Sequence, residues 1–158
     1  MTAQDDRPRR ARQGDLSAFN ELVAEHQSLV YNLCYRMLGH VQAAEDATQE
    51  AFIHAWRSIG SLRGESFRPW MLRIAANLCR DELRRRSRRP SASLDTALDA
   101  GLPEPADPDP QPEATALNRE LRGDLEAALR RLPHEQRLAV VLSDVEGLDY
   151  AEIAAAMK

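Results

Sequence analysis

Apolar residues recur every three or four positions over most of this chain, and that spacing places them on one face of an α-helix. The first apolar stripe follows Asp15 and Ser17, either of which can cap a helix, and it stops at Gly39, a residue type that commonly closes one. A second stripe runs from about residue 41 to 59. The pattern therefore predicts two amphipathic helices that pack against further helices.

The stretch 67–89 changes character along its length. Its first half carries an apolar helical stripe, made of Met71, Ile74, Ala75 and Leu78. Its second half is rich in arginine, and we name these residues the arginine collar: Arg80, Arg84, Arg85, Arg86, Arg88 and Arg89. Because a helix turns by about 100° per residue, consecutive arginines point in different directions, and no single carboxylate could neutralise them all. The collar is either a solvated helix end or a surface that packs against a polyanion.

The composition changes abruptly after residue 89. From residue 90 to about 115 the chain holds six prolines and six acidic residues but no basic one. Such a segment buries too little apolar surface to fold alone, and its prolines keep it extended. We expect residues 90–116 to be a flexible acidic linker. Residues 1–13, which are polar and rich in arginine, are expected to form a disordered tail.

Helical periodicity returns in the C-terminal part of the chain. Leucines recur every three or four residues up to Pro133, and proline is well suited to the first turn of a following helix. Gly147 is a predicted helix C-cap, and Asp149 with Glu152 has the spacing of a capping box. The chain is therefore predicted to be all-α, with two small helical domains, 14–89 and 117–158, joined by the Pro-rich acidic linker.

The charge is distributed unevenly between the two halves. Residues 1–89 hold 15 arginines and 11 acids, a net +4, whereas residues 90–158 hold 6 basic and 14 acidic residues, a net −8. The two halves thus present opposite electrostatic fields. Cys34 and Cys79 lack metal-ligand or CxxC spacing, so we interpret them as buried, reduced thiols. We expect no cofactor, no metal and no membrane insertion, and a soluble cytoplasmic protein.

Four motifs in a fixed order resemble a known family. They are AEDATQEAFIHAW, LRGESF, WMLRIAANLCRDELRRRSRR and LRRLPHEQRLAVVLSDVEGLDYAEIA. Together they resemble the extracytoplasmic-function (ECF) class of sigma-70-type transcription initiation factors. The resemblance covers roughly residues 15–89 and 117–157, which would correspond to sigma region two and sigma region four.

The resemblance implies a function in transcription initiation without enzymatic activity. Its partners would be core RNA polymerase, through the beta-prime clamp helices and the beta flap, then promoter DNA, and an anti-sigma factor. The helix that contains Asp46, Gln49 and Glu50 would dock on the beta-prime clamp helices. The acidic linker would thread through the nucleic-acid channel of the polymerase.

The same resemblance implies a set of DNA contacts. The loop before the arginine-rich helix is similar to the family's specificity loop, which receives a flipped base of the minus-ten element, and its residues are Arg63, Gly64, Glu65, Ser66 and Phe67. Flipping costs a few kcal/mol, which polar contacts in the loop must return. Asn77 would read the same element, since an amide presents both a donor and an acceptor to a base edge. Arg80, Arg84 and Arg85 would contact phosphates and position the DNA.

The C-terminal motif departs from the family pattern. Residues 149–158 match only the first helix of a helix-turn-helix, so we expect this second domain to be incomplete and not to read the upstream promoter element. That departure leaves an alternative open, namely a truncated sigma-like interaction module that binds polymerase or an anti-sigma factor without supporting initiation. A nuclease or metal-dependent hydrolase is disfavoured, because no metal-ligand spacing and no Gly-rich phosphate loop occur.

Overall fold

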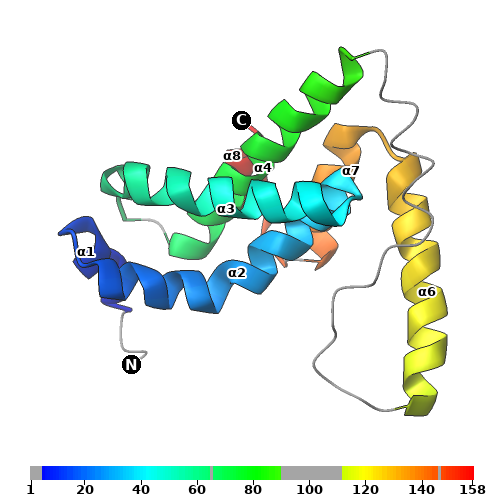
Figure 1. Ribbon diagram of the computed structural model, residues 1–158, viewed down its shortest axis with the longest axis horizontal. Coiled ribbons are helices and arrows are strands. Elements are labelled where there is room, and N and C mark those ends of the chain that lie inside the picture. The colour runs from blue at the N-terminus through cyan, green and yellow to red at the C-terminus, as the bar shows by residue number, and fades with distance from the viewer. Residues whose placement is uncertain (1–4, 65, 90–111, 146) are drawn as a thin grey trace.

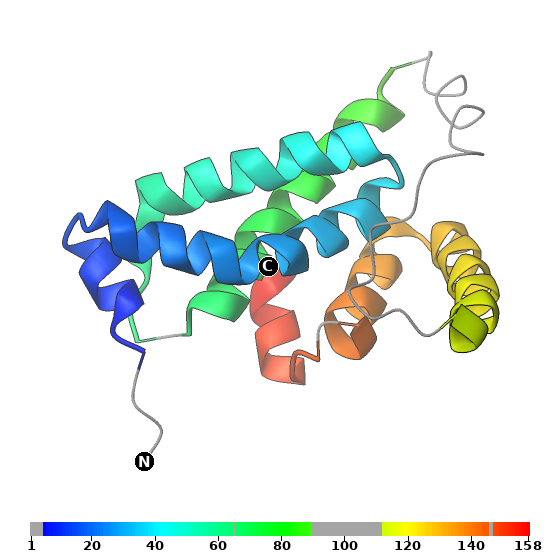
Figure 2. The same cartoon turned by 60° about the horizontal axis from the view of Figure 1, so that its bottom comes forward.

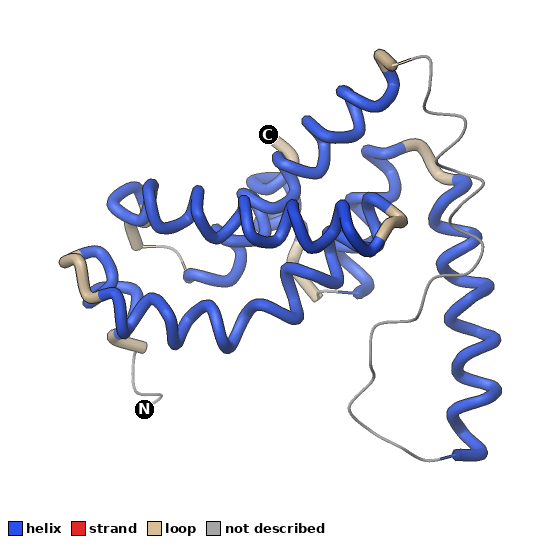
Figure 3. The backbone as a smooth tube through the Cα atoms, in the orientation of Figure 1, coloured by secondary structure: helices blue, strands red, loops and turns tan. Residues whose placement is uncertain are grey.

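The computed structural model describes residues 5–64, 66–89, 112–145 and 147–158, and throughout these ranges the regular elements are helices (Figure 3). The predicted all-α class is therefore confirmed. Most of the segment predicted to be a linker lies outside the described residues, but α6 (Pro112–Arg131) begins before residue 116. Proline is well suited to that first helical position, because its missing N–H would have no partner there.

Three long helices form the main bundle (Figure 1). They are α2 (Leu16–Leu38), α3 (Val41–Ser58) and α4 (Phe67–Ser87), and the short η1 (Ile59–Ser61) follows α3. Sequence signals set the bounds of α2 as predicted. The Asp15 carboxylate accepts a hydrogen bond from the Ala18 backbone N–H at 3.1 Å, and Gly39 ends the helix in the left-handed conformation at φ 69°.

The bundle buries most of the apolar side chains of these helices. Leu22, Leu33, Trp70, Met71 and Leu72 are among its largest fully buried side chains. Burial of each Leu or Met stabilises the fold by about 1.5–3 kcal/mol relative to leaving it exposed.

The predicted burial of both cysteines is confirmed. Cys34 and Cys79 are free thiols with no exposed surface, one on α2 and one on α4. A hydrogen bond with Cys79 lowers the pKa of Cys34, while the same contact and burial raise the pKa of Cys79. The two thiols therefore meet across the contact between α2 and α4.

A short helix at the N-terminus corrects the predicted disordered tail. Residues Arg7–Arg12 form α1, which packs on α2 and buries Ala11 completely. Arg7 bridges Asp5, at 2.8 Å, and Glu25 of α2, at 2.5 Å. These ion pairs join the polar segment to the bundle, which composition alone did not indicate.

The C-terminal half folds back onto the first half. After α6 come α7 (His134–Val140), the π-helical turn η2 (Val141–Val145) and α8 (Tyr150–Ala156). Figure 2 shows α7 in orange and α8 in red beneath the bundle, while α6 extends away from it. Both α7 and α8 contact α4, and the buried side chains of the two halves form one continuous cluster.

One buried arginine connects the two halves. Arg137 is 7% exposed, and its guanidinium donates to the backbone carbonyl of Met37 in α2 at 2.9 Å. It also donates to three carbonyls at the end of α6, those of Leu129, Arg130 and Leu132. A cation is favourable where helix carbonyls lack partners, so Arg137 ties the last turn of α6 to the last turn of α2.

Candidate nucleic-acid and polymerase interface

The exposed part of the arginine collar lies on the last turns of α4. Arg84 and Arg85 have side chains that are 64% and 63% exposed. Arg84 lies 3.5 Å from Asp81, and Arg85 pairs with Glu82. Exposed pairs of this kind contribute little to stability, so both guanidinium groups remain available to a stronger anion.

Arg86 has a structural part in the collar. Its guanidinium donates to the Leu38 carbonyl at the end of α2 at 3.1 Å and to Glu82 at 3.2 Å. It thereby satisfies a C-terminal carbonyl of α2, which has no partner within its own helix. We therefore assign Arg86 to the packing of α4 on α2.

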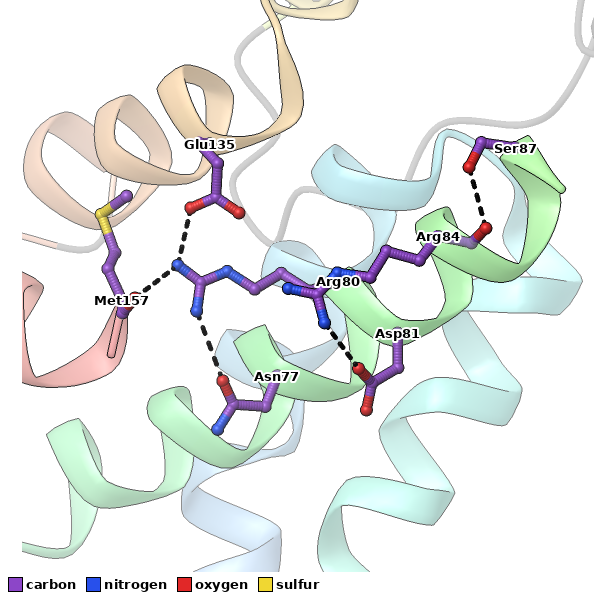
Figure 4. A network of polar contacts seen from close by, with 7 residues as sticks. All are labelled: Asn77, Arg80, Asp81, Arg84, Ser87, Glu135 and Met157. Atoms are coloured by element: carbon purple, nitrogen blue, oxygen red, sulfur yellow. Dashed lines mark hydrogen bonds and ion pairs between the residues drawn. The ribbon is translucent and has the colours of Figure 1, made fainter.

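Arg80 is the buried member of the collar (Figure 4). Its side chain is only 8% exposed, and one guanidinium nitrogen, Nη2, donates to Glu135 of α7 at 2.7 Å and to the Met157 carbonyl at the end of α8 at 2.8 Å. Its Nη1 reaches the Asn77 side-chain oxygen at 3.5 Å. The buried Nε has no hydrogen-bond partner among the described residues. In this conformation the predicted phosphate contact of Arg80 is covered by the C-terminal half.

The loop before α4 is held at both ends by buried apolar residues. Leu62 is 3% exposed and Phe67 is 5% exposed, whereas Arg63, Gly64 and Ser66 between them are exposed. Gly64 has φ +70°, which a residue with a side chain rarely adopts. Glu65, also predicted to contact DNA, lies outside the described residues.

Phe67 requires a correction of its predicted role. Its ring lies 5.1 Å from His26, 5.7 Å from Trp70 and 6.4 Å from Phe19, measured between ring centroids. A ring packed in this aromatic cluster cannot stack on a DNA base in this conformation. Phe67 instead anchors the loop to the core.

The predicted polymerase-binding residues lie together on the exposed face of α3. Asp46, Gln49 and Glu50 are all exposed. Asp46 accepts a hydrogen bond from Gln42 at 3.2 Å, and Glu50 lies 3.8 Å from His54. Both contacts stay within α3, and the three side chains remain exposed on the surface of the helix.

A groove of about 980 Å³ brings the two candidate surfaces together. Asp46 and Glu50 line it from α3, while Arg85 and Arg89 line it from the arginine collar. Its remaining walls come from the end of α2 and from Arg130, His134 and Arg137. The groove therefore presents both acidic and basic side chains to a binding partner.

The described residues were compared with the requirements of a metal site and of a membrane-spanning helix. Among the residues that the structure describes, no three His, Cys, Asp or Glu side chains are placed to hold a metal ion. Within the same ranges, no helix combines the length and apolar character needed to cross a membrane.

Comparison with known proteins gives the same division of the chain. The profile of Sigma-70 region 2 matches residues 22–89, and the profile of Sigma-70, region 4 matches residues 122–158. The chain belongs to the sigma-70 family. Region two thus contains most of the main bundle, and region four contains most of α6 together with α7 and α8.

Curated sigma-70 relatives place the chain in the ECF class. It is 43% identical over 145 residues to the ECF RNA polymerase sigma factor SigE of Mycolicibacterium smegmatis, an alignment that covers 92% of this chain. It is 38% identical over 156 residues to the ECF RNA polymerase sigma-E factor of Escherichia coli strain K12, covering 94% of this chain. The chain spans 55% of the M. smegmatis SigE, about half its length, and 79% of the E. coli protein.

Solved sigma factor structures share the fold. CnrH, in its complex with the cytosolic domain of CnrY, superimposes with a TM-score of 0.63 at 25% identity, covering 98% of this chain and 83% of CnrH. The sigma factor RpoE of Bartonella quintana, in complex with the anti-sigma factor NepR, gives a TM-score of 0.64 at 20% identity, with 87% and 81% of the two chains covered. The predicted family resemblance is confirmed.

Sequence reasoning missed how region four meets region two. Leu72, Ala76 and Arg80 follow one another at four-residue spacing, and the first two have no exposed surface. That spacing marks a second buried face of α4 and was the available signal that Arg80 points toward a neighbouring element. No comparable signal indicated the position of Arg137, because its partners are backbone carbonyls.

Proposed function

We propose that this sigma-70 family protein is a bacterial transcription initiation factor that binds core RNA polymerase and directs it to promoters. In this proposal it recognises the minus-ten element and helps to melt it. The work needs no covalent chemistry, because base capture and strand separation are driven by binding energy. Membership of the ECF class supports a role in transcription initiation, and the surface of α4 supports recognition of the minus-ten element.

The observation that carries the DNA-binding part is an exposed stripe along α4. Asn77, Asp81, Arg84 and Arg88 are all exposed and recur at helical spacing. At 1.5 Å per residue, Ser66 and Arg84 are separated by about 27 Å of helix. A strand along this stripe could place a flipped base in the loop and its phosphates on the collar.

Charge supports the same assignment. Over residues 81–89, Arg84, Arg85, Arg86, Arg88 and Arg89 supply five positive charges, against two negative charges from Asp81 and Glu82. The excess of three favours a polyanion over a single carboxylate partner. Phosphate contacts position a nucleic acid, while Asn77 and the loop would supply the base contacts.

The acidic face of α3 supports docking on polymerase. Asp46, Gln49 and Glu50 are exposed, and Asp46 and Glu50 line the groove, so this face is available to a basic helical partner. In this proposal the partner is the clamp helices of the beta-prime subunit, and region four contacts the beta flap. An anti-sigma factor is a further proposed partner, and polymerase binding would place the protein in the cytoplasm.

A second candidate function is an interaction module that binds polymerase or an anti-sigma factor without supporting initiation. The burial of Arg80 under α7 and α8 favours it, because a covered guanidinium contributes nothing to DNA binding. The two candidates differ in whether DNA joins the polymerase complex.

Binding to fork-junction DNA with a single-stranded minus-ten region, in the presence of bacterial core polymerase, tests the proposal. We expect a ternary complex that prefers one base at the flipped position and dissociates steeply with salt. The double variant Asp46→Ala/Gln49→Ala should weaken polymerase binding while the helical circular dichroism stays unchanged. Core binding without DNA preference would favour the interaction module, and absence of core binding would contradict the initiation factor and the polymerase-binding form of the module.

A further inference from the structure

The C-terminal half covers part of the surface to which the proposed function assigns DNA. Helices α7 and α8, which we name the latch, contact α4 and enclose Arg80. We infer that the latch is an autoinhibitory element in which Glu135 and the Met157 carbonyl occupy the guanidinium that a DNA phosphate would bind. The part of this inference that concerns DNA competition rests on the proposed function. The closing of the latch does not, because it can be measured without DNA.

The contact of Arg80 with the latch has two short hydrogen bonds but leaves one donor of the guanidinium without an acceptor. Nη2 donates to the Glu135 carboxylate at 2.7 Å and to the Met157 carbonyl at 2.8 Å, so one nitrogen carries both bonds. The buried Nε lacks a partner among the described residues, and a buried donor without an acceptor is costly. A phosphate can take two parallel N–H···O bonds from one guanidinium. Exchange of Glu135 for a phosphate could therefore satisfy the donor that the closed state leaves unpaired.

The two partners differ in how easily they are displaced. The Arg80 side chain is 8% exposed, whereas that of Glu135 is 58% exposed. Glu135 therefore lies at the solvated rim of the contact, where water can solvate its carboxylate when the contact breaks. The latch can open at this rim first.

A separate contact holds the latch on α2 and leaves Asn77 and Arg84 of the DNA stripe uncovered. Arg137, also in α7, donates to the Met37 carbonyl of α2 at 2.9 Å and is 7% exposed. Asn77 and Arg84 remain exposed in the closed arrangement. The closed protein therefore keeps part of its proposed DNA surface, and only the Arg80 position is withheld.

Opening is expected to raise the apparent affinity for DNA. When only a fraction of molecules is competent to bind, the apparent dissociation constant is raised by the inverse of that fraction. A charge-assisted hydrogen bond of the kind made by Glu135 shifts such an equilibrium by about threefold to tenfold after discounting for its exposure. The expected effect is therefore measurable by titration.

The test uses Glu135→Gln, which removes the charge and keeps the shape, and Glu135→Arg, which adds repulsion against Arg80. Glu120→Gln on α6 is the matched control, because it is exposed and loses the same charge. Spin labels on cysteines introduced at the exposed positions Arg57 of α3 and Ala154 of α8 report the distance between bundle and latch by pulsed electron resonance. The native cysteines are fully buried, so the labels should attach only at the new sites.

We expect the Glu135 variants, without DNA, to show a longer and broader label distance, with Glu135→Arg the more open, and Glu120→Gln to match the wild type. With core polymerase and fork-junction DNA, we expect Glu135→Gln to bind about threefold to tenfold more tightly than wild type. Unchanged distances in both Glu135 variants would overturn the latch. Longer distances without tighter DNA binding would overturn the competition, and a wild type that never binds DNA would refute the proposed function while the distances still decide the latch.

Discussion

At the scale of single residues, the arginines of α4 divide into three roles. Arg84 and Arg85 are exposed, Arg86 ties α4 to the end of α2, and Arg80 is enclosed by the latch. A run of arginines in a sequence therefore does not mean a uniform basic surface. Each guanidinium takes the role that its direction around the helix and its nearest carbonyl or carboxylate dictate.

The exposed pair gives a direct test of the phosphate role. Replacing Arg84 and Arg85 by Ala should weaken DNA binding for every promoter sequence alike, because phosphates carry no sequence information. If each arginine neutralises one phosphate, the slope of log affinity against log salt should fall by about 1.4 to 1.8 in magnitude. The measurement is a titration of fork-junction DNA against the polymerase complex at several salt concentrations.

A matched control separates local contact from overall charge. Arg9 of α1 is 71% exposed and pairs with Asp6, so Arg9→Ala removes a similar charge far along the chain from the collar. We expect that variant to keep the wild-type slope. A slope that stays unchanged in the Arg84 and Arg85 variant would remove these residues from the DNA interface.

At the scale of elements, helix ends follow local sequence signals closely. The capping box that starts α8 joins Asp149 and Glu152 reciprocally, with the Glu152 N–H donating at 2.8 Å and the Asp149 N–H at 2.9 Å. Because α8 is short, the cap is a large share of what holds its first turn. Its sequence pattern was sufficient to predict it.

Loss of this cap should loosen α8 without disturbing the main bundle. Asp149→Ala is expected to lower the free energy of unfolding by about 1 kcal/mol, because the backbone N–H of Glu152 loses its acceptor. Asp149→Ser, which keeps a capping oxygen, should lose only part of that. Urea titration followed by circular dichroism measures both, and equal stability of the Ala variant and wild type would contradict a contribution from the cap.

Long periodic helices could be predicted from the sequence, but the α1 segment could not. The bounds of α2 follow from Asp15 and Gly39, which act locally. By contrast, α1 depends on Arg7 reaching Glu25 on another helix, and such a tertiary ion pair leaves no periodic signal. Periodicity indicates that Arg80 faces a neighbouring element, but it does not identify the partner, because Glu135 is 55 residues away.

At the scale of the whole molecule, the two family regions share one buried cluster. Packing of α7 and α8 on α4 buries apolar side chains of both regions against one another. Sequence periodicity predicted the helices of each half but not their contact. The contact depends on Arg137 bonding to carbonyls of both halves and on Arg80 facing the latch, and carbonyl acceptors are the same in every sequence.

Photo-crosslinking from position 81 tests the central claim, that the exposed stripe of α4 lies along promoter DNA, most directly. Asp81 is exposed between Asn77 and Arg84 and has no proposed DNA contact of its own, so replacing it by a benzophenone amino acid preserves the interface. The control places the same group at Asn20, which is exposed on α2. In the complex with core polymerase and fork-junction DNA, we expect a crosslink from position 81 to the single-stranded minus-ten strand and none from position 20. Crosslinks from position 81 to polymerase alone, in a complex that contains DNA, would contradict it.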